Sequence, residues 1–274
     1  MRSSGGSSGC ETDTRFEWGA RTYLFGILNL TPDSFSGDGV RDVDAAVARA
    51  VAMRDFGADV IDVGGESTRP GHTPVVEEEE LRRVEHVIAA LASRGFVVSV
   101  DTRKPVVARR ALGLGATIVN DVSGLADPAM ARLVAETGAM AVLMDDADVR
   151  GSDDPVAEVQ RDLARLVDRA ERGGIGRGRL ILDPGFGFGK GPRENLRILR
   201  DLRRLRELGL PILVGTSRKS TIGKVLGDAP PDERLEGTAA TVAIAITNGA
   251  DAVRVHDVRE MARVARMSDA IVRG

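Results

Sequence analysis

Eight short apolar runs, each followed by a polar cluster and then by a helical pattern, constrain the fold of this chain more than any other feature. Short apolar runs bounded by turn-forming residues are typical of buried strands. The predicted strands are Tyr23–Leu30, Val60–Gly64, Val97–Asp101, Thr117–Asp121, Met140–Met144, Leu180–Asp183, Ile212–Thr216 and Ala252–His256. Eight strand–helix units in roughly 250 residues predict an α/β chain that forms a single (β/α)₈ TIM barrel.

The residues at the strand ends are the main candidates for function. Such barrels place their active sites at the C-terminal ends of the strands. The charged and amide residues at those ends are Asn29, Asp62, Asp101, Asn120, Asp121, Asp183, Lys219, Arg254 and His256. We therefore expect these side chains to meet at one mouth of the barrel.

Residues 1–18 begin with the small polar stretch MRSSGGSSGC, and we interpret them as a flexible leader outside the fold. The barrel domain is then predicted to span residues 19–274. Amphipathic patterns predict helices over Asp44–Phe56, Glu77–Ser93 and Arg193–Leu208. A further helix over Arg234–Asn248 is apolar on most faces, which on the outside of a barrel indicates an interface between subunits, and so a homodimer.

The composition excludes several classes of partner. The formal net charge is −3 and aromatic residues make up 3% of the chain, so nothing indicates a nucleic-acid interface. No apolar stretch approaches the roughly 20 residues of a membrane span. The single cysteine, Cys10, rules out an intrachain disulfide framework. We expect a cytoplasmic protein that acts on small molecules.

Two aspartates and one asparagine at strand ends indicate a site for a planar, nitrogen-rich ring. Asp101, Asn120 and Asp183 each close an apolar strand. A carboxylate accepts two parallel N–H bonds from an amino-pyrimidine edge, as it does from a guanidinium group. The alternative for each aspartate is a helix cap or a turn.

A second, basic cluster indicates phosphate binding. Ser217-Arg218-Lys219-Ser220 follows the seventh predicted strand, and Arg254 and His256 belong to the eighth. The loops after strands seven and eight of a TIM barrel often hold phosphate. Arginine suits bidentate contact with phosphate, and lysine supplies a point charge. The alternative is a solvated basic turn.

The glycine-rich segment Asp183–Gly191, DPGFGFGKG, matches neither the Walker nor the dinucleotide pattern. We interpret it as a tight loop that lets a substrate approach the backbone. The histidines and carboxylates show no zinc spacing. Mg²⁺ shared between Asn29 and substrate phosphates is the metal that the sequence allows, because Mg²⁺ commonly uses few protein ligands.

Three connecting segments stand out. Thr31–Val40 and Gly65–Val75 are rich in Gly, Ser and Pro, and we expect them to be mobile lids. Asp145–Pro155 is strongly acidic. This third segment either tunes access to the site or is a solvated surface loop, and we favour the solvated loop.

Seven motifs link these segments to a known family. They are Gly26–Ser36, Gly57–Gly71, SVDTRK from Ser99, NDVSG from Asn120, DPGFGFGK from Asp183, VGTSRKS from Val214 and ADAVRVHD from Ala250. With these motifs in this order, nearly everything after residue 20 resembles the dihydropteroate synthases, the folate-pathway transferases that sulfonamides inhibit. The resemblance implies that a 7,8-dihydropterin bearing a CH₂-pyrophosphate condenses with p-aminobenzoate to give dihydropteroate and pyrophosphate.

The resemblance also implies roles for individual residues. The pterin site would comprise Asp101, Asn120, Asp183, Lys219, Arg254 and Met144. The pyrophosphate site would comprise Asn29, Arg254 and His256, with Mg²⁺ near Asn29. The p-aminobenzoate site would comprise Thr68, Phe188, Arg218 and Ser220. The mobile loops would carry Thr31, Pro32, Asp33, Ser34, Phe35, Ser67, Arg69 and Pro70.

One motif departs from the family. A Met-His-Met type sequence usually follows strand five, and here Met144 is followed by Asp145 in place of the histidine. Two other functions share parts of the pattern: a pterin-dependent methyltransferase barrel, and a barrel that binds pterin or phosphate without catalysis. The SRKS and RVHD motifs favour the synthase over both, because neither alternative needs residues for a pyrophosphate leaving group.

Overall fold

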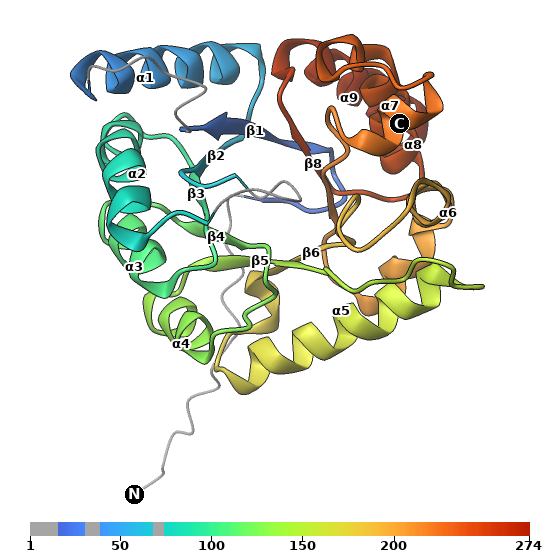
Figure 1. The fold of residues 1–274 in the computed structure, drawn as a ribbon, viewed down its shortest axis with the longest axis horizontal. Coiled ribbons are helices and arrows are strands. Elements are labelled where there is room, and N and C mark those ends of the chain that lie inside the picture. Colours follow the sequence, from blue (N-terminus) through green and yellow to red (C-terminus); the bar gives the residue numbers. More distant parts are fainter. Residues whose placement is uncertain (1–15, 31–38, 68–73) are drawn as a thin grey trace, which may run out of the picture.

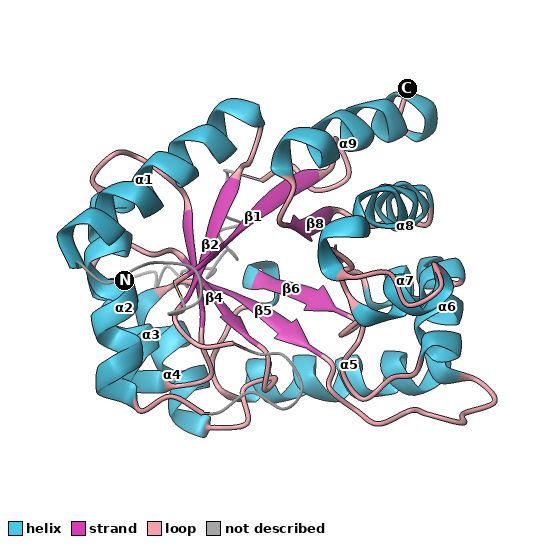
Figure 2. Ribbon diagram, turned by 45° about the horizontal axis from the view of Figure 1, so that its top comes forward, coloured by secondary structure: helices cyan, strands magenta, loops and turns pink. Residues whose placement is uncertain are grey.

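A computed structural model describes residues 16–30, 39–67 and 74–274. Eight parallel strands run in the order β6-β5-β4-β3-β2-β1-β8-β7, with helices around them (Figures 1 and 2). A bridge between Leu182 and Ile212 joins the two ends of this sheet, which confirms the predicted (β/α)₈ barrel. The predicted loop residues Thr31, Pro32, Asp33, Ser34, Phe35, Thr68, Arg69 and Pro70 lie outside the described residues.

The strands match the eight predicted ones to within a few residues. They are β1 (Tyr23–Asn29), β2 (Val60–Gly64), β3 (Val98–Asp101), β4 (Ile118–Asp121), β5 (Met140–Met144), β6 (Leu180–Asp183), β7 (Leu213–Val214) and β8 (Ala252–Val255). Each strand is short, and nearly every residue in it is buried because one face meets the barrel interior and the other meets helices.

The helices form the outer layer in Figure 2. They are α1 (Gly39–Phe56), α2 (Glu77–Ala92), α3 (Pro105–Gly113), α4 (Pro128–Thr137), α5 (Pro155–Arg172), α6 (Pro192–Arg200), α7 (Ser220–Val225), α8 (Leu235–Thr247) and α9 (Val258–Val272), with the short 3₁₀ helices η2 (Arg177–Arg179), η3 (Leu202–Leu208) and η4 (Pro231–Glu233). Four of the α-helices begin with proline, which has the backbone angle of a first helical residue and lacks an N–H that the helix could not use. The side chains of Asp127 and Asp154 cap α4 and α5.

The apolar side chains form two cores. The inner core fills the barrel below the mouth, with Phe25, Ile118 and Ile181 among its members. The outer core lies between the strands and the helices. Apolar side chains fill the lower part of the barrel, so polar residues that could form a site lie at the carboxyl ends of the strands.

The N-terminal boundary of the barrel lies earlier than predicted. Phe16 is buried and stacks on Trp18, and both rings contact Tyr23 of β1. Residues 16–18 therefore belong to the barrel, and the predicted leader can at most comprise residues 1–15, which lie outside the described part of the chain together with Cys10.

One predicted helix is interrupted in the structure. The predicted helix over Arg193–Leu208 is divided into α6 and η3 at Asp201, where the backbone leaves the helical region. Helix α8 buries one side against its neighbours and leaves Ile244 exposed. Within the described residues, no helix is long and apolar enough to cross a membrane.

Candidate active site

The carboxyl ends of neighbouring strands lie level with one another, which brings the predicted site residues together. In the parallel register, Gly64 pairs with Asp101, and Asp101 pairs with Asn120. On the other side of the barrel, Met144 pairs with Asp183. The strand ends thus form one mouth, as the sequence predicted.

A buried ionic network occupies one side of this mouth. Nε of Arg254, on β8, donates to Oδ2 of Asp62 at 2.6 Å, and its Nη2 donates to Oδ2 of Asp101 at 2.6 Å. The amide of Asn120 donates to the same Asp62 oxygen at 3.2 Å. Four side chains from four strands are therefore fixed relative to one another by charge-assisted hydrogen bonds.

Asp183 and Lys219 lie at the β6 and β7 side of the mouth. The Asp183 carboxylate accepts a hydrogen bond from the amide of Gly185 at 2.8 Å, which closes the turn after β6. The Lys219 ammonium donates to the carbonyl of Phe186 and lies 4.5 Å from the ring centre of Phe188. Lys219 also interacts electrostatically with Asp183 and Arg254, so the charged groups on the two sides of the mouth affect one another.

Burial shifts the pKa values of these groups towards their neutral forms. It raises the pKa of Asp101 to about 7, against the opposing effect of Arg254. It also raises the pKa of Asp183 and lowers the pKa of Lys219 to about 8. For Arg254, burial opposes the charge, but Asp62 and Asp101 outweigh it and raise the pKa. Buried carboxylates of this kind gain most from a ligand that brings N–H donors or positive charge.

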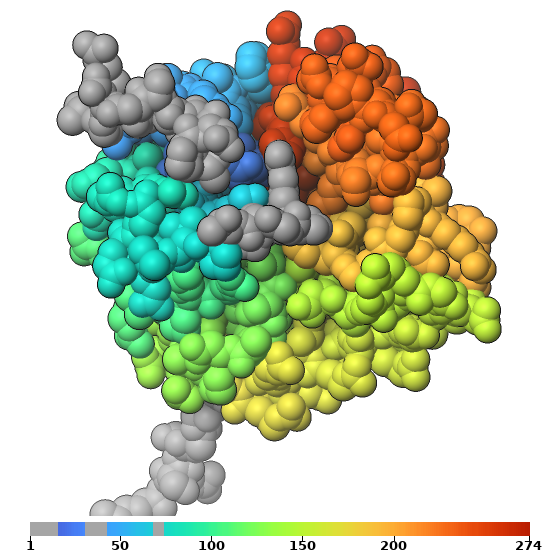
Figure 3. Space-filling model, in the orientation of Figure 1, coloured from blue at the N-terminus to red at the C-terminus, as the bar shows by residue number. Residues whose placement is uncertain are grey.

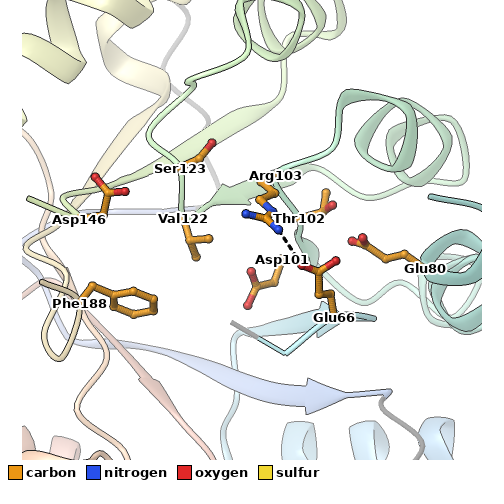
Figure 4. A pocket seen from close by; sticks show the side chains of 9 residues that line it. All are labelled: Glu66, Glu80, Asp101, Thr102, Arg103, Val122, Ser123, Asp146 and Phe188. Carbon is orange, nitrogen blue, oxygen red and sulfur yellow. Dashed lines mark hydrogen bonds and ion pairs between the residues drawn. The ribbon is translucent and has the colours of Figure 1, made fainter. Parts of the chain in front are cut away.

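A cavity of about 210 Å³ opens beside Asp101 (Figure 4). Its wall is formed by Glu66, Glu80, Asp101, Thr102, Arg103, Val122, Ser123, Asp146 and Phe188. Figure 4 shows the Phe188 ring on the opposite side of the cavity from Asp101 and Glu66. The cavity therefore joins the ionic network to an aromatic face.

Lys104 stabilises the acidic wall of the cavity. Its ammonium group contacts the carboxylates of both Glu66 and Glu80, which are themselves buried. Arg103 forms a 3.2 Å ion pair with Glu66. No role for these groups could be predicted from the sequence, because they come from a loop and a helix rather than from a strand end.

The predicted phosphate residues are only partly brought together. The Nδ1 atom of His256 lies 3.0 Å from Oγ of Ser217, which orients the imidazole ring beside β8. Arg218 turns away to form a bidentate ion pair with Asp257, with one hydrogen bond at 2.9 Å. Ser220 is exposed at the start of α7. Neither Arg218 nor Ser220 lines the cavity described above.

Asn29 ends β1 opposite Gly64, close to Asp101. No cluster of three or more acidic, histidine or cysteine side chains suited to a metal occurs among the described residues. The Asn29 amide offers one oxygen donor, which fits Mg²⁺ that is held mainly by substrate oxygens. This donor set does not fit a metal held by the protein alone.

Two glycines of the loop after β6, Gly185 and Gly189, pack against protein, and the approach of a substrate to the backbone of this loop stays a prediction. A Cβ atom at Gly185 would lie 1.7 Å from the carbonyl oxygen of Asp145, and one at Gly189 would lie 2.4 Å from that of Ala147. Both glycines have positive φ angles, 65° and 58°. They are needed because the loops after β5 and β6 meet backbone to backbone.

The prediction of a solvated acidic loop over Asp145–Pro155 holds for three of its five aspartates but is wrong for Asp145. Asp146, Asp148 and Asp153 are exposed. Asp145 is 2% exposed and pairs with the side chain of Lys190. The burial of Asp145 could not be predicted from the acidic composition of its segment, because it results from contact with the loop after β6.

Two residues of the site were not assigned a role from the sequence. Asp62 was noted at a strand end, yet it is the acceptor that Arg254 and Asn120 share. Lys190 was read as part of a glycine-rich loop. The apolar alternation in VIDVG is the one signal for Asp62, because it places the side chain on the inner face of β2.

Comparison with known families agrees with this geometry. The model of the pterin-binding enzyme family matches residues 25–256, which includes every strand except the start of β1. The dihydropteroate synthase of Clostridium beijerinckii is 47% identical over 262 residues, which cover 94% of this chain and 97% of the relative.

Solved structures give the same result. A crystal structure of the dihydropteroate synthase of Clostridium difficile, obtained in the presence of pteroic acid, has a TM-score of 0.90 at 47% identity and covers 94% of this chain and 100% of that one. The enzyme of Xanthomonas albilineans in complex with 7,8-dihydropteroate has a TM-score of 0.84 at 42% identity, over 92% and 94% of the two chains. This chain therefore belongs to the dihydropteroate synthases, a family of pterin-binding transferases.

Proposed function

We propose that this chain condenses 7,8-dihydropterin-6-ylmethyl pyrophosphate with p-aminobenzoate, giving 7,8-dihydropteroate and pyrophosphate. The observation that carries the proposal is the buried arrangement of Arg254, Asp62 and Asp101 beside Asp183. It supplies carboxylates for the N–H groups of a pterin and a cation for its leaving group. Membership of the synthase family favours this reaction over methyl transfer or simple binding.

The pterin would lie across the mouth, with its amino-pyrimidine edge towards Asp183 and Asn120. Asp101 and Lys219 would bind the remaining polar atoms of the ring, and Arg254 would lie along its face. Met144 is buried at the end of β5 and would pack beneath the ring, since methionine fits irregular apolar gaps.

Departure of the leaving group is the step that these charges would assist. The bond between the CH₂ carbon and the pyrophosphate oxygen breaks, and its electron pair leaves with pyrophosphate. The carboxylates of Asp101 and Asp183 stabilise the positive charge that develops on the pterin, while Arg254 and His256 stabilise the leaving group. The amine of p-aminobenzoate then bonds to the carbon and loses a proton, so no covalent intermediate on the protein is required.

Mg²⁺ bound to the pyrophosphate near Asn29 would supply further positive charge to the leaving group. The Phe188 ring would form one wall of the aminobenzoate pocket. Thr68 would complete this pocket from the loop after β2, and Arg218 and Ser220 would do so from the loop after β7. We infer that Arg218 reaches the substrate only if it exchanges its contact with Asp257.

The overall reaction is tested by measuring pyrophosphate release with and without p-aminobenzoate. We expect fast release only when both substrates are present, together with a product that contains the pterin and the aminobenzoate in equal amounts. Pyrophosphate release without a joined product would contradict the proposed condensation.

The pterin site is tested by Asp183→Asn. The amide retains the oxygen that accepts from Gly185, so the turn after β6 should remain folded. It cannot accept two N–H bonds or carry charge, and the loss of a charged hydrogen bond should lower turnover about ten- to a hundredfold. Asp228→Asn, at an exposed aspartate after α7, is the matched control and should leave turnover unchanged. Near-normal activity of Asp183→Asn would remove this residue from the pterin site.

The leaving-group site is tested by calorimetry with pyrophosphate. His256→Ala, Arg254→Lys and chelation of Mg²⁺ should each weaken binding, by about tenfold or more where a charged hydrogen bond is lost. Their effects should not add, because all three groups act on one charge. Unchanged affinity in both variants would place the phosphate site elsewhere.

The chain would act as a homodimer in the cytoplasm. Four apolar side chains stay at least 41% exposed on the adjoining helices α8 and α9: Ile244, Met267, Ile271 and Val272. These helices form one flank of the molecule, coloured orange to red in Figure 3. Exposed apolar surface on two adjoining helices supports an interface between subunits.

The dimer is tested by the double substitution Met267→Glu and Ile271→Glu, followed by light scattering coupled to size-exclusion chromatography. We expect the mass to fall from that of two chains to that of one, because a buried charge without a partner opposes association. Val106→Glu, at an exposed valine of α3, is the control and should leave the dimer intact. A wild-type chain that is monomeric at micromolar concentration would refute this proposal.

A further inference from the structure

The loops after β5 and β6 are joined by an ion pair that is closed off from solvent. The ammonium nitrogen of Lys190 lies 2.8 Å from Oδ2 of Asp145. The two side chains are 0% and 2% exposed, respectively.

The same two loops also meet through their backbones. The amide of Asp145 donates to the carbonyl of Asp183 at 2.9 Å, and the amide of Val149 donates to that of Gly189 at 3.0 Å. The absence of a side chain at Gly185 and at Gly189 is what permits this approach. A movement of one loop would therefore move the other.

Lys190 connects the ion pair to the cavity. Its ammonium group donates to the carbonyl of Phe188 at 2.8 Å and to the carbonyl of Asp145 at 3.1 Å. The Phe188 side chain forms the aromatic wall of the cavity, and Lys219 lies over its ring. The backbone position of Phe188 is thus set by a lysine whose charge Asp145 balances.

The buried charges of Asp145 and Lys190 stabilise each other away from water. Burial raises the pKa of Asp145, and Lys190 counteracts that shift. If either side chain were replaced alone, the other would be left as an uncompensated charge away from water. The loops would then separate to admit water, and Phe188 would lose its fixed position.

We propose that Asp145 and Lys190 are positioning residues that hold the loop after β6 so that Phe188 forms the wall of the aminobenzoate pocket. This proposal rests on the function assigned above, in which Phe188 lines that pocket. It concerns binding of the second substrate, because the pair holds the backbone of Phe188, whose ring is assigned to the aminobenzoate pocket. Neither Asp145 nor Lys190 lines the described cavity, so the pair acts through Phe188.

The test uses the double variant Asp145→Asn/Lys190→Met, which removes both charges while keeping the side chains close to their original size. Paired removal avoids an isolated buried charge, so this variant should fold where single variants fail. We expect the KM for p-aminobenzoate to rise about two- to tenfold, as for the loss of one hydrogen bond, with the KM for the pterin substrate changed less than about twofold. Asp148→Asn, at an exposed aspartate of the same loop, is the control and should change neither constant.

The route through Phe188 is tested by making the same double change in a Phe188→Ala background. If the pair acts through the ring, the further increase in the KM for p-aminobenzoate should disappear, because the effects of coupled residues do not add. An equal increase in both backgrounds, or no increase with Phe188 present, would overturn the proposal.

A measurement that does not depend on catalysis separates this inference from the proposed function. Hydrogen–deuterium exchange of the segment 184–191 should be faster in the double variant than in the wild type or in Asp148→Asn. Unchanged exchange would overturn the positioning role even if the chain is an active synthase. Faster exchange in a chain that forms no dihydropteroate would instead overturn the assigned reaction and leave the loop contact established.

Discussion

The guanidinium group of Arg254, shared between the carboxylates of Asp62 and Asp101, is the interaction on which the rest of the site depends. Asp62 and Asp101 lie on neighbouring strands, and both are buried. Without the arginine, two buried like charges would repel each other across the mouth of the barrel. With it, the carboxylates keep their positions yet remain short of positive charge, since Asp183 adds a third acid to the same field. These carboxylates would be stabilised by a ligand that is rich in N–H groups and becomes cationic as it reacts.

Much of this arrangement could be predicted because it follows from strand geometry. Apolar runs located all eight strands, and parallel pairing then places the last residues of neighbouring strands at the same level. The pairing of Asp101 with Asn120, and of Met144 with Asp183, is the direct result. A rule that needs only the order and ends of the strands was therefore enough to bring together most of the residues proposed for the pterin site.

The interactions between loops could not be predicted in the same way. Asp145 looked like one member of an acidic surface segment, and Lys190 looked like part of a tight glycine-rich loop. Their burial is decided by the contact of two loops that are 45 positions apart, not by local composition. Phe16 shows the same limit, because a polar leader gave no sign that the next aromatic ring closes the barrel interior. Asp62 was visible at its strand end, but its role depends on a partner 192 positions away.

The ion pair between Asp145 and Lys190 also affects the electrostatics of the mouth, because the charge of Asp145 compensates that of Lys190. Lys190 lies close enough to the mouth to lower the pKa of both Lys219 and Asp183. An unbalanced ammonium group there would compete with Lys219 for Asp183, the carboxylate that is assigned to the pterin edge. Asp145 supplies the opposite charge at the same depth, so that the pair acts on the site mainly as a dipole whose field falls off faster with distance than that of a single charge. The chain can in this way use a lysine to fix the backbone of Phe188 while the electrostatics of the mouth remain set by Arg254, Lys219 and their acids.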